Sequence, residues 1–151
     1  MYNDLSSFFA QVKDKSAEDV CEFIGGKVQE NNFKNCCAVR MSYAFNKAGI
    51  KIPYIENETV SGAKKNENDK NEPKVWYIFR VRVFKNFLEN KKYTKYSTNE
   101  KSLKSFKGKK GVIVFDVNFK DATGHIDLFN GSSVEGSDYT NKANNITLYE
   151  I

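Results

Sequence analysis

The chain has 151 residues, enough for one domain with a sizeable core and too few for two comfortable ones. Its net charge of +5 favours an anionic partner such as a cell-wall polymer, nucleic acid or an acidic protein, without choosing among them. Arginine occurs only at positions 40, 80 and 82, so the Arg clusters that read bases or clamp phosphates are absent and we expect no nucleic-acid partner.

Three cysteines, Cys21, Cys36 and Cys37, are an odd number and cannot form a closed disulfide framework. This usage is typical of a chain made in a reducing compartment that holds at least one free thiol. The first residues lack the basic and apolar regions of a secretory signal, and no apolar run is long enough to cross a bilayer. We therefore expect synthesis in the cytoplasm and no membrane insertion. One histidine and two adjacent cysteines are a poor ligand set, so we expect no metal or cofactor.

Two short helices are predicted at the start of the chain. Apolar residues between Leu5 and Val12 recur at helical spacing. Ser16 begins a second helix with Asp19 in the capping-box position, and Gly25-Gly26 ends it.

A third predicted helix begins at Asn35, a good N-cap, and ends before Gly49. Its apolar face is formed by Cys37, Met41, Ala44, Phe45 and Ala48. Cys37 would be the second residue of this helix, pointing towards the rest of the fold.

The middle of the chain predicts a loop, a strand and a helix. Residues 61–74 contain almost nothing apolar and indicate a solvated, mobile loop. Val75–Val81 is rich in aromatic and β-branched residues and predicts a buried strand. The spacing of the apolar residues at 83, 84, 87 and 88 predicts a helix directly afterwards, before a connection rich in Lys, Ser and Tyr.

Three strands are predicted near the end: Gly111–Val117, His125–Phe129 and Ile146–Ile151. Asn130-Gly131 is a strong turn signal after the second. Helices first and an antiparallel sheet last indicate the α+β class, in a single domain spanning residues 1–151.

Cys37 is the candidate nucleophile. The unpaired N–H groups and the dipole at a helix N-terminus favour a thiolate over a thiol. Cys36 is rotated by roughly 100° around the helix, which takes it off the apolar face. Cys21 belongs to another helix and is interpreted as a core residue.

His125 is the only histidine and therefore the only candidate for an imidazole base. We expect the Cys37 sulfur and the His125 ring to lie within or slightly beyond hydrogen-bonding distance in a surface cleft. The group that orients the base is usually a carboxylate or amide, and Asp127, Glu135 and Asp138 are all close in sequence. Asp127 points the same way as His125, but its side chain is expected to be too short to reach the ring along one strand. A neighbour beyond the turn would meet the ring more directly, so Asp138 is preferred.

A non-catalytic binding module remains an alternative, because an apolar-face cysteine is more often a core residue and a lone histidine more often caps a strand. Rapid alkylation of one cysteine by iodoacetamide would favour the enzyme.

Two segments carry a resemblance to a known family. Residues 35–43 read Asn-Cys-Cys-Ala-Val-Arg-Met-Ser-Tyr, followed by Asn46, and residues 124–131 read Gly-His-Ile-Asp-Leu-Phe-Asn-Gly. They resemble the nucleophile and histidine motifs of the type VI secretion amidase effectors of the fourth family, bacterial toxins that cut peptidoglycan. Shorter similarities follow the same order along nearly the whole chain, at residues 24–26, 60–63, 77–81 and 108–113.

The chain departs from the family pattern at three points. Phe129 replaces the usual Trp. No cysteine follows Cys37, so a cysteine pair that braces the loop after the histidine in some members is missing. The family's third catalytic residue is an Asp shortly after the Asn-Gly turn, which Asp138 matches only if this loop carries a short insertion.

The resemblance implies a papain-like fold related to the NlpC-type cell-wall peptidases, and a site of Cys37, His125 and Asp138. It also implies hydrolysis of the D-glutamyl to meso-diaminopimelate amide bond of peptidoglycan stems, with the backbone N–H of Cys37 helping to hold the oxyanion. The implied partners are a cognate immunity protein and a component of the secretion needle, and the implied destination is the periplasm of a target bacterium. A papain-like deamidase or transglutaminase acting on protein is the alternative within the same fold.

Overall fold

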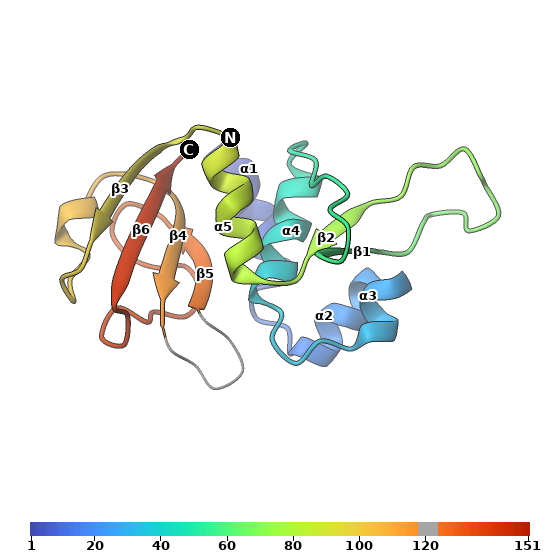
Figure 1. The fold of residues 1–151 in the computed structure, drawn as a ribbon, viewed down its shortest axis with the longest axis horizontal. Coiled ribbons are helices and arrows are strands. Elements are labelled where there is room, and N and C mark those ends of the chain that lie inside the picture. The colour runs from blue at the N-terminus through green and yellow to red at the C-terminus, as the bar shows by residue number, and fades with distance from the viewer. Residues whose placement is uncertain (118–123) are drawn as a thin grey trace. The chain divides into compact units, whose positions relative to one another are not determined.

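The computed structural model describes residues 1–117 and 124–151. The chain divides into two compact units, Asn3–Phe79 and a second unit made of Met1–Tyr2 with Arg80–Ile151. The first holds most of the helices and the second holds a four-stranded antiparallel sheet, which confirms the predicted α+β class (Figure 1). None of the helices in the described ranges is long and apolar enough to cross a membrane.

The predicted N-terminal helices are present as α1 (Tyr2–Phe9) and α2 (Ala17–Ile24). The Ser16 hydroxyl caps α2 by accepting the backbone N–H of Asp19 at 3.1 Å, as the capping-box pattern predicts. Gly25 ends α2 with a φ of 73°. A helix that was not predicted, α3 (Gly26–Asn31), follows at once.

Gly26 explains why two helices can follow one another so closely. Its φ of 59° suits a residue without a side chain. A Cβ at this position would lie 2.4 Å from the backbone carbon of Gly62, so the chain passes too close for any other residue. Two of the short segments that contribute to the resemblance, residues 24–26 and 60–63, therefore meet through their backbones.

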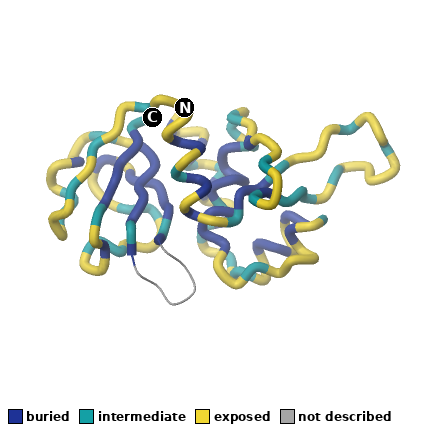
Figure 2. Tube along the Cα trace, viewed as in Figure 1, coloured by how far each residue is buried: buried dark blue, intermediate teal, exposed yellow. Residues whose placement is uncertain are grey.

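The central helix of this unit is α4 (Cys37–Lys47), whose inner residues are almost all buried (Figure 2). It lies beside a two-stranded antiparallel sheet of β1 (Thr59–Ser61) and β2 (Trp76–Ile78) (Figure 1). The strand β2 is shorter than predicted because Val81 already begins the next helix.

Residues 62–75, between β1 and β2, form an extended and mostly exposed connection without a helix or strand, in agreement with the predicted loop (Figures 1 and 2). The connection is bonded within itself. The Glu72 carboxylate accepts the backbone N–H groups of Lys65 at 2.7 Å and Asn66 at 3.0 Å.

The second unit contains α5 (Val81–Asn90), the 3₁₀ turn η1 (Lys104–Phe106) and a sheet with the strand order β3-β6-β4-β5. The strands are β3 (Thr94–Thr98), β4 (Gly111–Asp116), β5 (Gly124–Phe129) and β6 (Asn145–Glu150), all antiparallel to their neighbours. The three predicted C-terminal strands are confirmed within a residue at their ends. The edge strand β3 was missed because its residues are polar and no more than half-buried.

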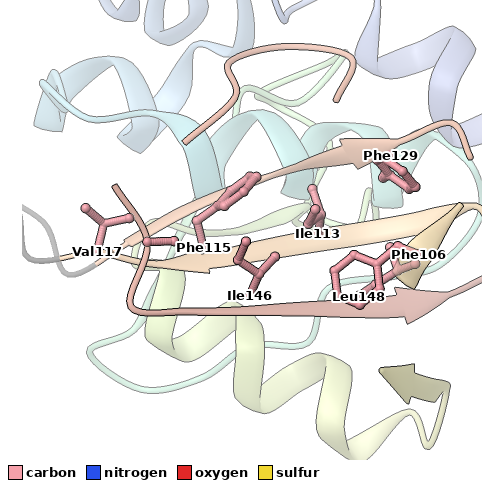
Figure 3. Packing of buried hydrophobic residues seen from close by; sticks show 8 residues of the cluster. Phe106, Ile113, Phe115, Val117, Phe129, Ile146 and Leu148 are labelled. Carbon is pink, nitrogen blue, oxygen red and sulfur yellow. The ribbon is translucent and has the colours of Figure 1, made fainter. Parts of the chain in front are cut away.

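One face of this sheet carries a core cluster of Phe106, Ile113, Phe115, Val117, Phe129, Ala143, Ile146 and Leu148 (Figure 3). Phe115 lies directly opposite His125 in the pairing of β4 with β5, and Ile113 lies opposite Asp127. Alternate residues of a strand share a face, so His125 and Asp127 lie on the face that carries this cluster. Truncating Phe115 to Ala would cost about 3–5 kcal/mol of stability, which indicates how firmly the strand under His125 is held.

Candidate active site

Cys37 is the first residue of α4 and is 6% exposed. Cys36, not Asn35, occupies the N-cap position, so the predicted start of the helix was one residue early. The Asn35 side chain still serves the helix end, because its Oδ1 accepts the backbone N–H of Cys37 at 3.2 Å. The N–H that was expected to hold an oxyanion therefore already has an acceptor.

Cys36 is not turned away from the interior, as its helical phase had suggested. Its side chain is 1% exposed, and its sulfur lies 3.7 Å from that of Cys21. Burial, followed by the neighbouring Cys21, raises the pKa of Cys36 to about 12. Cys36 is therefore a protonated thiol at neutral pH and a poor nucleophile.

The polar residues of the nucleophile motif fix α4 in its unit. Ser42 bonds to both backbone groups of one residue of β2, donating to the carbonyl at 3.1 Å and accepting the N–H at 2.9 Å. Each of the motif's polar side chains reaches a different part of the unit: Arg40 the carbonyl of Lys15, Ser42 the backbone of Ile78, Tyr43 the side chain of Gln11, and Asn46 the carbonyl of Trp76. We infer that these polar side chains position the helix that carries Cys37.

His125 has a carboxylate partner on its own strand. The imidazole Nε2 lies 2.8 Å from Oδ2 of Asp127, two residues further along β5. The expectation that Asp127 is too short to reach the ring was wrong, because side chains at i and i+2 stand on one face of a strand and the long imidazole spans the gap.

The Asp127 carboxylate is 1% exposed and is surrounded by donors. Oδ1 accepts the backbone N–H groups of Leu128 at 2.8 Å and Gly136 at 2.9 Å. Oδ2 accepts the backbone N–H of Ser137 at 2.9 Å in addition to its contact with His125. These hydrogen bonds offset the cost of burying the carboxylate and fix its orientation.

Gly136 allows this arrangement, and sequence reasoning missed it. A Cβ at Gly136 would lie 2.5 Å from Oδ2 of Asp127, so any side chain there would displace the carboxylate or the loop. The only signal in the sequence was a small residue, flanked by Glu135 and Ser137, shortly after the Asn130-Gly131 turn.

Two aromatic rings hold the imidazole from the side. The Tyr139 ring lies 4.6 Å from that of His125, centroid to centroid, with an interplanar angle of 54°. The Phe115 ring, opposite on β4, is stacked at 6.1 Å. Such packing limits the rotation of the imidazole about its side-chain bonds.

The other two candidate carboxylates have different partners. Asp138 is exposed, and its Oδ1 accepts the backbone N–H of Thr140 at 2.8 Å and the hydroxyl of the same residue. Glu135 accepts a hydrogen bond from the Tyr2 hydroxyl. Beyond Gly131 the loop makes one antiparallel bridge, between Phe129 and Val134, and Asp138 follows in an irregular segment. The carboxylate bonded to His125 is that of Asp127, which makes Asp127 rather than Asp138 the candidate for the residue that orients the ring.

Cys37 lies in the unit Asn3–Phe79 and His125 in the unit that contains the four-stranded sheet. Their approach to hydrogen-bonding distance therefore stays a prediction. Within the described ranges, no group of three or more His, Cys, Asp and Glu side chains could hold a metal ion.

Comparisons with known proteins place the chain in a family. Residues 33–149, which include both motif segments, match the family model of amidase effector protein 4 of the type VI secretion system, Tae4. A comparison with curated proteins finds no match.

Solved structures of effectors from two bacteria are similar over nearly the whole chain. The effector Tae4 from Salmonella typhimurium, in complex with the immunity protein Tai4 from Enterobacter cloacae, is 29% identical with a TM-score of 0.84, covering 99% of this chain and 98% of that one. In the Salmonella Tae4–Tai4 complex the effector is 30% identical with a TM-score of 0.83, covering 99% and 97%. Tae4 from Enterobacter cloacae is 30% identical with a TM-score of 0.82, covering 99% and 95%.

These similarities confirm the predicted papain-like fold and make the chain an amidase, against the alternative of a non-catalytic binding module. The chain belongs to the Tae4 family of type VI secretion amidase effectors, which are delivered to target cells.

Proposed function

We propose that this amidase acts on peptidoglycan and cuts the amide bond between D-glutamate and meso-diaminopimelate in the stem peptides. The observation that carries the proposal is the hydrogen bond between His125 and the buried Asp127. It lies in the segment that resembles the family's histidine motif and supplies the oriented imidazole that a thiol-dependent amidase needs.

In the proposed reaction Cys37 is the nucleophile. Its thiolate attacks the amide carbonyl, and the tetrahedral intermediate collapses to a thioester when protonated His125 gives a proton to the leaving amine. A water molecule then attacks the thioester while neutral His125 accepts the proton from that water. The second collapse releases the carboxylic acid and restores the thiolate and imidazolium pair.

Asp127 is proposed to set the tautomer of His125. An ionised carboxylate accepts hydrogen bonds only, so Oδ2 keeps a proton on Nε2. In the neutral ring the lone pair that accepts a proton is then on Nδ1, and the carboxylate stabilises the imidazolium when it forms. Because Asp127 is itself fixed by three backbone N–H groups, it can orient the ring without rearranging.

The site of action is proposed to be the periplasm of the target bacterium, where the wall polymer lies. The net charge of +5 suits an anionic wall. Relatives have been solved with the immunity protein Tai4, and we propose that this chain has a cognate immunity partner and a secretion-needle component as a carrier.

The experiment is product analysis by mass spectrometry after incubation of the protein with purified muropeptides. We expect fragments ending in D-glutamate and fragments beginning with meso-diaminopimelate, and neither with Cys37→Ala. Ammonia release from protein glutamine, with intact muropeptides, would instead assign a deamidase. Cleavage at another amide of the stem would retain the amidase and reject the bond assignment.

A further inference from the structure

Cys21 and Cys36 form a buried pair of thiols that the proposed reaction does not use. Each side chain is 1% exposed, and the two sulfurs lie 3.7 Å apart. Cys21 belongs to α2, and Cys36 is the N-cap of α4 and the direct neighbour of Cys37. The pair therefore brings α2 against the N-cap of α4, one residue before the proposed nucleophile.

Both sulfurs lie beside the same turn of backbone. The carbonyl of Phe33 is 3.3 Å from the sulfur of Cys36 and 3.9 Å from that of Cys21. The carbonyl of Ala17 is 3.7 Å from the sulfur of Cys36. Weak contacts of this kind hold the two thiols towards each other without a covalent bond.

We propose that Cys21 and Cys36 are a disulfide-forming pair, whose oxidation cross-links α2 to the N-terminus of α4 and leaves Cys37 as the free thiol. A disulfide requires a sulfur separation of about 2.05 Å, so the two atoms must approach by about 1.7 Å. We expect side-chain rotation, with a small shift of α2 where needed, to supply a movement of this size.

The reaction is thiol–disulfide exchange with a disulfide oxidant such as glutathione disulfide. One cysteine, as a thiolate, attacks a sulfur of the oxidant and expels one glutathione, which leaves a mixed disulfide. The other cysteine attacks the protein sulfur of the mixed disulfide and expels the second glutathione. Two protein thiols thus lose two protons and two electrons, and one glutathione disulfide becomes two thiols.

The folded pair is protected from rapid reaction. The pKa of Cys36 is raised to about 12, so little thiolate exists at neutral pH. We expect exchange to proceed when the segment before α4 opens transiently, because Lys34 and Asn35 are exposed while the two sulfurs are buried. Oxidation should therefore be slow but complete in an oxidising buffer.

The cross-link closes a loop of 15 residues and restrains the backbone directly before Cys37. A bridge that closes a loop of this length stabilises the fold because it lowers the entropy of the unfolded chain. For a chain of this size we expect the melting temperature to rise by about 6–12 °C. The proposal does not depend on which bond the enzyme cuts, so a failed muropeptide assay would leave it standing.

The test uses the purified full chain, equilibrated in glutathione buffers of increasing oxidised fraction, followed by alkylation and intact mass measurement. In the Cys37→Ala variant only Cys21 and Cys36 remain, so an intramolecular disulfide must join them. We expect a loss of about two mass units, no alkylation, and the stated rise in melting temperature on oxidation. A matched Cys37→Ala/Cys36→Ser variant should show none of these changes.

Peptide mapping of the oxidised wild-type chain gives a second test, which does not depend on whether the Cys37→Ala variant folds. A linked pair of peptides with the bond assigned to Cys21 and Cys36, and alkylation of Cys37 alone, would support the proposal. A bond to Cys37, glutathione adducts without an internal disulfide, or an oxidised form that melts at or below the reduced form would overturn it.

Discussion

His125 and Asp127 meet along one strand, with Nε2 of the imidazole 2.8 Å from Oδ2 of the carboxylate. The pair lies on the sheet face that carries Phe115 and the core cluster, and the carboxylate is bonded to three backbone N–H groups from its own strand end and the loop that follows. The carboxylate is thus held by the backbone of the fold, and we propose that it orients the imidazole.

Replacing Asp127 by Asn should reduce turnover strongly. The side-chain NH₂ of Asn would face either the backbone N–H groups that now bond to Asp127 or Nε2 of His125. In the first case the hydrogen bonds of the loop are lost, and in the second the tautomer of His125 is disturbed. We expect kcat to fall by about 10²–10⁴-fold with a much smaller change in KM. Steady-state kinetics on one muropeptide, with a thermal melt to establish folding, is the measurement. Asp138→Asn is the control and should stay near wild type, and the reverse ranking of the two variants would refute the assignment of Asp127.

Gly136→Ala should weaken the same arrangement without changing a reacting group. The added Cβ would lie 2.5 Å from Oδ2 of Asp127, so the loop or the carboxylate must move. We expect a loss of about tenfold or more in kcat, since the misplaced carboxylate no longer holds the imidazole. Ser137→Ala keeps the backbone N–H that bonds to Asp127 and should retain activity. Equal kinetics for the two variants would mean that the loop adapts freely.

The three cysteines should differ sharply in their effect on activity. Cys37→Ala should abolish amidase activity, whereas Cys21→Ala and Cys36→Ala should keep most of it, because these two form a separate buried pair. Each buried truncation should still cost stability, so activity is compared well below the melting temperature of each variant. If Cys36→Ala were folded and as inactive as Cys37→Ala, the assignment of the nucleophile would be wrong.

Stability should fall in alkaline solution, in part through Cys36. The pKa of this thiol rises from 9.0 to about 12 in the fold because of burial, and burial likewise raises the pKa of Tyr77 from 10.0 to about 12. At pH values between the unfolded and the folded pKa of each group, the unfolded chain has lost a proton that the folded chain retains. The contribution of these groups to the free energy of unfolding is therefore fully present below about pH 9 and is lost as the pH rises towards 12.

Urea unfolding under reducing conditions, from about pH 7 to about pH 10.5, measures this loss. The free energy of unfolding should fall less steeply with pH in Cys36→Ala, because the variant lacks the thiol. The difference in slope should correspond to at most about one bound proton. The exposed variant Ser132→Ala should follow wild type. Identical slopes for Cys36→Ala and wild type would show that Cys36 does not titrate differently in the two states.

Local sequence signals were sufficient for most of the fold. Ser16 with Asp19 predicts the start of α2, and the β-branched run at Gly111–Asp116 predicts a strand in which every residue but Asp116 is buried. In both places local preference and tertiary packing agree. Local preference does not predict the polar strand β3, which is held by its pairing with β6. It does not predict the helix that begins at Gly26 either, which is held by close backbone contact.

The candidate site was less predictable because its partners depend on tertiary geometry. Helical spacing placed Cys37 and Cys36 on different faces, but it could not show that the second face is also buried, against Cys21. Strand alternation placed Asp127 beside His125 correctly. It could not show that a loop ending at Gly136 would hold the carboxylate within reach of the ring.

Trapping a covalent intermediate on Cys37 is the sharpest measurement of whether this residue is the nucleophile. Wild-type protein is mixed with an excess of muropeptide, quenched in acid within the first turnovers, and mapped by mass spectrometry, beside Cys37→Ala and Asp127→Asn. We expect a thioester at Cys37 that carries the fragment ending in D-glutamate, none with Cys37→Ala, and slower formation with Asp127→Asn. Hydrolysis by Cys37→Ala at the wild-type rate, or an acyl group on any other residue, would contradict it.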